Sequence, residues 1–168
     1  METIATMGFL ARLFGAVPKE ERDGIRLSDQ EPWCVSPTKD VARFLRALPS
    51  LVPLGSVAYF EDTAESHVAR YLRSVSIPAE AQLAMGTIWP RPDCYHVPVT
   101  AETMQNLAVF LEQNPAGFFC THCHVYRDGV VLLQWHDAFI GDPMYISRTI
   151  SADAVSAFAE KLGSSWSA

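Results

Sequence analysis

The residues with the clearest chemical character form the short run "CTHCH" at positions 120–124. Its spacing is C-x-x-C-H, the pattern that attaches c-type haem, and closely related spacings hold zinc or form redox-active thiol pairs. Letters alone match such patterns by chance, so the elements around the run have to decide between these chemistries.

The run lies in a predicted β-hairpin. Two stretches rich in apolar residues, 118–126 and 130–139, flank an Asp-Gly pair, which is a strong hairpin signal. One possible register closes the hairpin with a two-residue loop, and the other uses a bulged turn that pairs Tyr126 with Val130. We favour the bulged register because it separates an apolar face from a mostly polar one.

This geometry argues against haem and against a thiol pair. On an extended strand Cys120 and Cys123 point to opposite faces and lie about 10 Å apart. A disulfide needs Cα atoms within about 7 Å. Haem attachment also requires export, and the N-terminus has neither the basic start nor the cleavage site of a signal peptide. We therefore reject c-type haem and expect no redox pair.

The favoured register assembles a different group. Cys120 and His122 share the polar face, and His136 lies opposite Cys120 on the neighbouring strand. Three such ligands, with cross-strand and diagonal separations of about 5 to 7 Å, could surround one zinc ion. Alternatively, Cys120 and His136 could act as the nucleophile and base of a hydrolase. The plainer interpretation is that these histidines are only solvated or hydrogen-bonded.

A second candidate group lies in the segment "WPRPDCYH". Trp, Tyr and Arg are the residue types enriched at binding hot spots, and two prolines make this turn rigid. The segment is therefore a candidate contact surface for a partner, with Trp89, Arg91, Asp93 and Tyr95 as its residues. The alternative is that its aromatic residues belong to the core.

Charge and composition favour binding over catalysis. A net charge of −6 argues against a nucleic-acid partner and suits a basic protein. No apolar run approaches the roughly 20 residues of a membrane span, and no nucleotide-binding or hydrolase motif is present. We interpret the chain as a small, acidic, cytoplasmic protein of bacterial type that binds a macromolecule, for example an immunity- or antitoxin-type inhibitor. The zinc or cysteine hydrolase is the alternative.

The periodicity of apolar residues predicts an α+β fold. We expect a mainly antiparallel sheet of about six strands, with three to four amphipathic helices largely on one face. The domain should span residues 25–163, after an N-terminal segment (1–24) that is a short amphipathic helix or disordered, and before a flexible tail (164–168). The expected helices are 36–48, 64–75, 101–114 and 152–162, and the expected strands are 55–62, 82–90, 94–99, 118–126, 130–139 and 144–150. Ser36, Thr100 and Ser151 are the expected N-caps of the first, third and fourth helices. Pro49 should stop the first helix, and Gly163 should close the last.

Overall fold

The structure is a computed structural model that describes residues 23–62, 65–84, 86–87 and 91–168. In this part of the chain seven strands form one sheet with all neighbours antiparallel, and four helices pack against it. This confirms the predicted α+β class, with one strand more than expected. Most of the predicted N-terminal segment, residues 1–22, lies outside the described residues.

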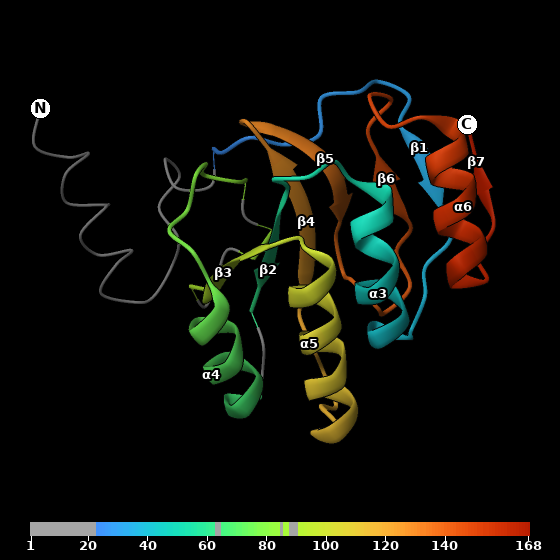
Figure 1. The fold of residues 1–168 in the computed structure, drawn as a ribbon. Coiled ribbons are helices and arrows are strands. Elements are labelled where there is room, and N and C mark those ends of the chain that lie inside the picture. Colours follow the sequence, from blue (N-terminus) through green and yellow to red (C-terminus); the bar gives the residue numbers. More distant parts are fainter. Residues whose placement is uncertain (1–22, 63–64, 85, 88–90) are drawn as a thin grey trace, which may run out of the picture.

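The elements follow one another along the chain as Figure 1 shows. The order of the strands across the sheet is β3-β2-β4-β5-β6-β1-β7. The strands are β1 (Trp33–Val35), β2 (Val57–Glu61), β3 (Cys94–Pro98), β4 (His122–Arg127), β5 (Val130–Trp135), β6 (Met144–Ile146) and β7 (Trp166–Ser167). The helices are α3 (Val41–Leu51), α4 (Ser66–Val75), α5 (Ala101–Gln113) and α6 (Ala152–Leu162).

Two helices begin at the caps that the sequence predicts. The side chain of Thr100 accepts a hydrogen bond from the backbone at the start of α5, and Ser151 does the same for α6. Gly163 ends α6 in the left-handed conformation, with φ of 68°, that glycine adopts without strain.

Helix α3 differs from the prediction at both ends. Its N-cap is Asp40, whose side chain accepts from the backbone N–H of Arg43. Ser36, the predicted cap, is instead bonded to Ser165 through both its backbone and its hydroxyl group. Pro49 was expected to stop the helix but lies inside its last turn. A local cap signal was therefore overridden by a long-range pairing.

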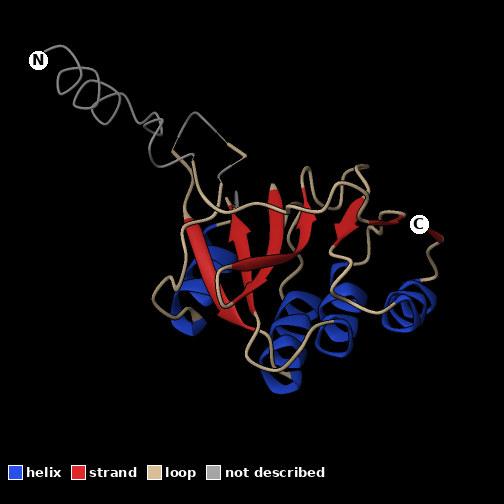
Figure 2. Ribbon diagram, turned by 90° about the horizontal axis from the view of Figure 1, so that it is seen from above, coloured by secondary structure: helices blue, strands red, loops and turns tan. Residues whose placement is uncertain are grey.

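All four helices lie on the same side of the sheet (Figure 2). The main hydrophobic core fills the space between these two layers, with fully buried Phe44, Phe60 and Trp135 among its largest side chains. The predicted placement of the helices on one face is thus confirmed. None of the helices in the described ranges is both long and apolar enough to cross a membrane.

Residues 164–168, predicted as a flexible tail, contain β7. This strand pairs with β1, so that Val35 lies opposite Trp166, and the rings of Trp33 and Trp166 meet edge to face at 5.5 Å. Neither strand was predicted, because runs of three and two residues are too short to show a period of two.

The turn of the β4–β5 hairpin has the two-residue register that we did not favour, and beyond Tyr126 a bulge moves the pairing away from both predicted registers. Its loop is the two-residue pair Asp128-Gly129, both with positive φ, so Arg127 pairs with Val130. Leu132 is then an extra residue that forms a bulge in β5, since Val125 pairs with Leu133. The bulge restores the separation of apolar and polar faces that we expected from a bulge in the turn.

The helix-free face of the sheet is partly covered by two segments. Residues 23–27 form one of them, and residues 77–84 and 86–87, here called the crossing segment, belong to the other; the two meet where Ile25 bridges to Leu83. They bury a small second core, whose residues are Val57, Tyr59, Leu83, Tyr126 and Val131. The predicted strand at 82–90 is absent from the described residues of that range apart from this single bridge.

Candidate functional site

Two rows of polar side chains run across the helix-free face, and the strand register defines them. Cys94 of β3, Glu61 of β2 and His122 of β4 are direct neighbours in the first row. The second row consists of His96, Tyr59, His124 and Gln134. Side chains that lie opposite one another on adjacent antiparallel strands are close enough to interact.

Glu61 is the centre of this polar face. Its side chain is fully buried, yet it accepts three hydrogen bonds. One comes from the hydroxyl of Tyr59 at 2.9 Å, and two come from the backbone N–H groups of Gly86 and Thr87 at 3.1 and 2.5 Å. His122 Nε2 lies 4.0 Å from Oε1 of Glu61, the oxygen that accepts from Thr87. A buried acidic group needs such partners, so Glu61 ties residues 86–87 to the sheet.

The hydrogen bonds around Tyr59 show which groups donate and which accept. Because the Tyr59 hydroxyl donates its proton to Glu61, its oxygen is the acceptor for the Cys94 thiol, whose sulfur lies 3.1 Å away. Burial raises the pKa of Cys94 to about 11 and raises the pKa of Tyr59 well above its usual range. Both groups are therefore protonated at neutral pH, and Cys94 is a thiol rather than a reactive thiolate.

Three histidine rings lie together beside Glu61. The rings of His122 and His124 are parallel with centroids 6.4 Å apart, and that of His136 meets each edge to face at 5.0 Å. Burial lowers the pKa of His124 to about 3, assisted by the two neighbouring histidines. Burial and the neighbouring His122 also lower the pKa of His136. His124 and His136 are thus neutral at pH 7.

The backbone fixes which nitrogen of two rings carries the proton. His124 Nδ1 accepts from the backbone N–H of Trp135 at 3.2 Å, and His122 Nδ1 accepts from that of Asp137 at 3.1 Å. A neutral imidazole that accepts at Nδ1 carries its proton on Nε2. The nitrogen that faces away from the backbone is therefore a donor in both rings. A metal ion would require that proton to leave and the hydrogen bond to be replaced.

The structure does not bring the three predicted zinc ligands together as the favoured register implied. Thr121 is a bend and β4 begins only at His122, so the alternation of faces does not extend back to Cys120. Cys120 instead packs in the main core with Cys123, and both are free thiols. The expectation that these two cysteines point to opposite faces is wrong for this reason.

His136 lies against His122 rather than opposite Cys120. Among the described residues, no three His, Cys, Asp or Glu side chains are arranged to hold a metal ion. Burial also raises the pKa of the Cys120 thiol well above its usual value, which opposes its use as a nucleophile. Zinc binding itself stays a prediction, but it would need ligands other than the proposed trio.

The predicted contact surface near "WPRPDCYH" is only partly at the surface. Tyr95 is 3% exposed and packs in the main core. Asp93 is exposed and forms an ion pair with Arg73 at 2.6 Å. Arg91 is exposed, and Trp89 lies outside the described residues. The core interpretation therefore holds for Tyr95, and Arg91 is the residue of this group that reaches a cavity.

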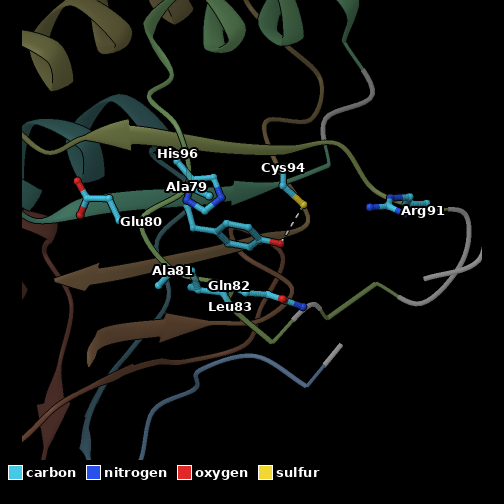
Figure 3. A pocket seen from close by; sticks show the side chains of 9 residues that line it. Ala79, Glu80, Ala81, Gln82, Leu83, Arg91, Cys94 and His96 are labelled. Carbon is cyan, nitrogen blue, oxygen red and sulfur yellow. Dashed lines mark hydrogen bonds between the residues drawn. The ribbon is translucent and has the colours of Figure 1, made fainter. Parts of the chain in front are cut away.

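That cavity lies on the helix-free face, between β2, β3 and the crossing segment (Figure 3). Its volume is about 450 Å³, within the range of small-molecule sites. Cys94 and His96 of β3 and Tyr59 of β2 supply the wall formed by the sheet. The remaining lining residues are Ala79, Glu80, Ala81, Gln82, Leu83 and Arg91.

A single glycine allows the crossing segment to reach Glu61. A Cβ atom at Gly86 would overlap with the ring of His122. We expect Gly86→Ala to lower the free energy of unfolding by about 2 kcal/mol, because the overlap displaces the backbone that bonds Glu61. Urea unfolding measures this. Gly141→Ala is the matched control, since a Cβ there meets nothing within 4 Å. Equal stabilities of the two variants would contradict the role of Gly86.

Comparisons with known proteins do not identify this site, so its interpretation rests on the geometry described above. No family model, no curated protein and no solved structure was found to match the chain. Sequence reasoning missed Glu61 and Cys94 as members of the site. The available signal was a glutamate at the end of the otherwise apolar strand "VAYFE", two residues after a tyrosine on the same face.

Proposed function

We propose that the protein acts by binding a basic protein partner, and that an acidic rim at one end of the sheet makes the contact. The rim consists of Asp62, Asp137 and Asp142. Two loops, one after β2 and one between β5 and β6, bring these three carboxyl groups together. The observation that supports the proposal is that no basic side chain in the described part of the chain is paired to any of them.

Backbone hydrogen bonds bring these loops together. The N–H of Thr121 bonds to the carbonyl groups of Glu61 and Asp62, and the carbonyl of Thr121 accepts from Ala138. The end of β2, the start of β4 and the loop after β5 therefore meet at one end of the sheet. Trp135 holds the next part of that loop, because its indole N–H donates to the carbonyl of Asp142 at 2.7 Å.

The rim also offers apolar surface and keeps its negative charge. Ile140, in the loop between Asp137 and Asp142, is 61% exposed. His136 lies close enough to interact electrostatically with the carboxylates of Asp137 and Asp142. Burial lowers its pKa, however, so it is neutral at pH 7 and does not offset their charge. Negative charge around an exposed apolar side chain suits a basic partner, which it attracts over a distance and then contacts.

An immunity- or antitoxin-type inhibitor, which covers a basic surface of its target, is a protein of this kind. A cytoplasmic location is part of the proposal. It is supported by the four cysteines, all of which are free thiols, as expected in a reducing compartment.

Capture from a lysate of the source cells tests the proposal. Immobilised wild-type protein should retain a basic protein that Asp62→Asn/Asp137→Asn/Asp142→Asn releases. Asparagine suits this test because Asp62 and Asp137 have φ of 57° and 43°, a region that asparagine tolerates. The variant thus removes charge while keeping the loop conformation.

The control removes the same charge elsewhere. Glu102→Gln/Asp153→Asn/Glu160→Gln lies on the exposed surface of α5 and α6, and it should retain the partner as the wild type does. Retention of the same proteins by the wild type and the rim variant would refute the proposal, and so would the absence of any protein held by the wild type alone.

A further inference from the structure

The cavity on the helix-free face has features that the proposed protein contact does not use. It is bounded by the polar rows of the sheet on one side and by residues 79–83 on the other. Its position on the face, rather than on the loops of the acidic rim, makes it a separate site. The hydrogen bonds of the residues that line the cavity indicate which chemical groups it could bind.

The wall that the sheet supplies is aromatic. The ring of Tyr59 meets that of His96 edge to face at 5.3 Å. Tyr59 itself is 2% exposed and held at its hydroxyl by Glu61 and Cys94, so its ring has a fixed orientation. Across from it the crossing segment contributes alanines and Leu83. Small apolar side chains facing an aromatic wall leave room for a flat ring.

The hydrogen-bond partner of His96 defines which of its two ring nitrogens carries the proton. The hydroxyl of Tyr126 accepts from the backbone N–H of Glu80 at 3.3 Å and lies 2.9 Å from His96 Nδ1. That nitrogen is the acceptor for the hydroxyl proton among the described residues, so His96 carries its own proton on Nε2. Burial lowers the pKa of His96. The ring is therefore a neutral donor at pH 7.

Opposite charges lie at the two ends of the cavity. Arg91 lies beyond Cys94 at one end, and Glu80 lies beyond His96 at the other (Figure 3). A carboxylate suits the guanidinium end, where it would form a charge-assisted hydrogen bond. A hydroxyl group suits the other end, because it can accept from His96 Nε2–H and donate to Glu80.

We propose that this cavity binds a flat aromatic hydroxy acid, with its carboxylate at Arg91 and its hydroxyl at His96. The aromatic part then lies between the ring of His96 and the alanines at positions 79 and 81. Cys94 contributes its sulfur to the wall but no negative charge, since burial raises the pKa of its thiol to about 11.

A fluorescent probe of this shape, 6-hydroxy-2-naphthoate, tests the site. We expect it to bind the full-length protein saturably and to shift the ring signals of His96 in NMR spectra. Its neutral amide, and 2-naphthoate, which lacks the hydroxyl, should each bind at least about tenfold more weakly, equal to about 1.4 kcal/mol. No shift of the His96 signals, or equal binding of the three compounds, would overturn the proposal.

Two arginine variants separate recognition of the carboxylate from a general effect of charge. Arg91→Gln should weaken binding of the naphthoate by about tenfold while leaving the binding of its amide unchanged. Arg70→Gln is the matched control, since Arg70 is exposed on α4 and away from the cavity lining. It should bind both compounds as the wild type does. Equal naphthoate affinities of the two variants would count against the assigned orientation.

Discussion

Replacing Glu61 by alanine is expected to lower the free energy of unfolding by about 3 kcal/mol or more. The change leaves the buried hydroxyl of Tyr59 and the partly buried backbone N–H groups of Gly86 and Thr87 without their acceptor, and it opens a cavity in place of a fully buried side chain. An unsatisfied buried donor destabilises a fold by about 1 to 3 kcal/mol. Urea unfolding followed by circular dichroism measures the difference.

The control for this variant is Glu160→Ala. Glu160 is exposed on α6, and alanine is the best helix former, so the change should alter stability by about 0.5 kcal/mol or less. Glu61→Gln should lie between the two variants because its amide oxygen still accepts. If Glu61→Ala were as stable as Glu160→Ala, the view that Glu61 organises the polar face would be wrong.

Acid should destabilise the protein through its buried histidines. The pKa of His124 is lowered to about 3 in the folded protein, whereas an unfolded chain binds this proton near pH 6.5. Above that pH neither state is protonated and His124 has no effect. Below it the unfolded state alone takes up the proton, so stability is lost as pH falls, by about 1.4 kcal/mol per pH unit from this residue.

Unfolding in urea at a series of pH values between about 6.5 and 5.5 measures this slope, above the range in which carboxylates titrate. His124→Gln should have a smaller slope, whatever its stability at neutral pH. Some slope should remain, because the pKa values of His96 and His136 are also lowered by burial. Identical slopes for the variant and the wild type would show that His124 is protonated in the folded protein.

The helical part of the fold was the most predictable from sequence. Thr100, Ser151 and Gly163 act on backbone groups within four residues, so their signals are local and they cap the helices as expected. Asp40 and Ser36 show the limit of such signals. Both are good caps, and the pairing of Ser36 with Ser165, 129 residues away, decides between them.

The register of the hairpin shows why the site was less predictable. A bulge at Leu132 depends on how β5 fits between two strands: β4 on one side and β6, which pairs Leu133 with Ile146, on the other. None of this is local to the turn. Together the two-residue loop and the bulge shift the pairing by two residues from the favoured register. This keeps the faces of both strands but changes the neighbour of His136 from Cys120 to His122.

Glu61 could not have been assigned to the site from its own segment. Its partners come from β3, from β4 and from residues 86–87, which are separated from it in sequence by tens of residues. A glutamate at the end of a strand usually faces solvent. Only the crossing segment over the helix-free face explains why this one is buried.

The affinity of the purified partner for three forms of the protein tests the central claim most directly. We compare the wild type, the rim variant Asp62→Asn/Asp137→Asn/Asp142→Asn and the helix-surface variant Glu102→Gln/Asp153→Asn/Glu160→Gln, each at low and at moderate salt. The rim variant should bind at least about tenfold more weakly and lose most of the salt dependence, because both arise from the same charges. Equal dissociation constants for the rim and helix-surface variants would contradict the claim.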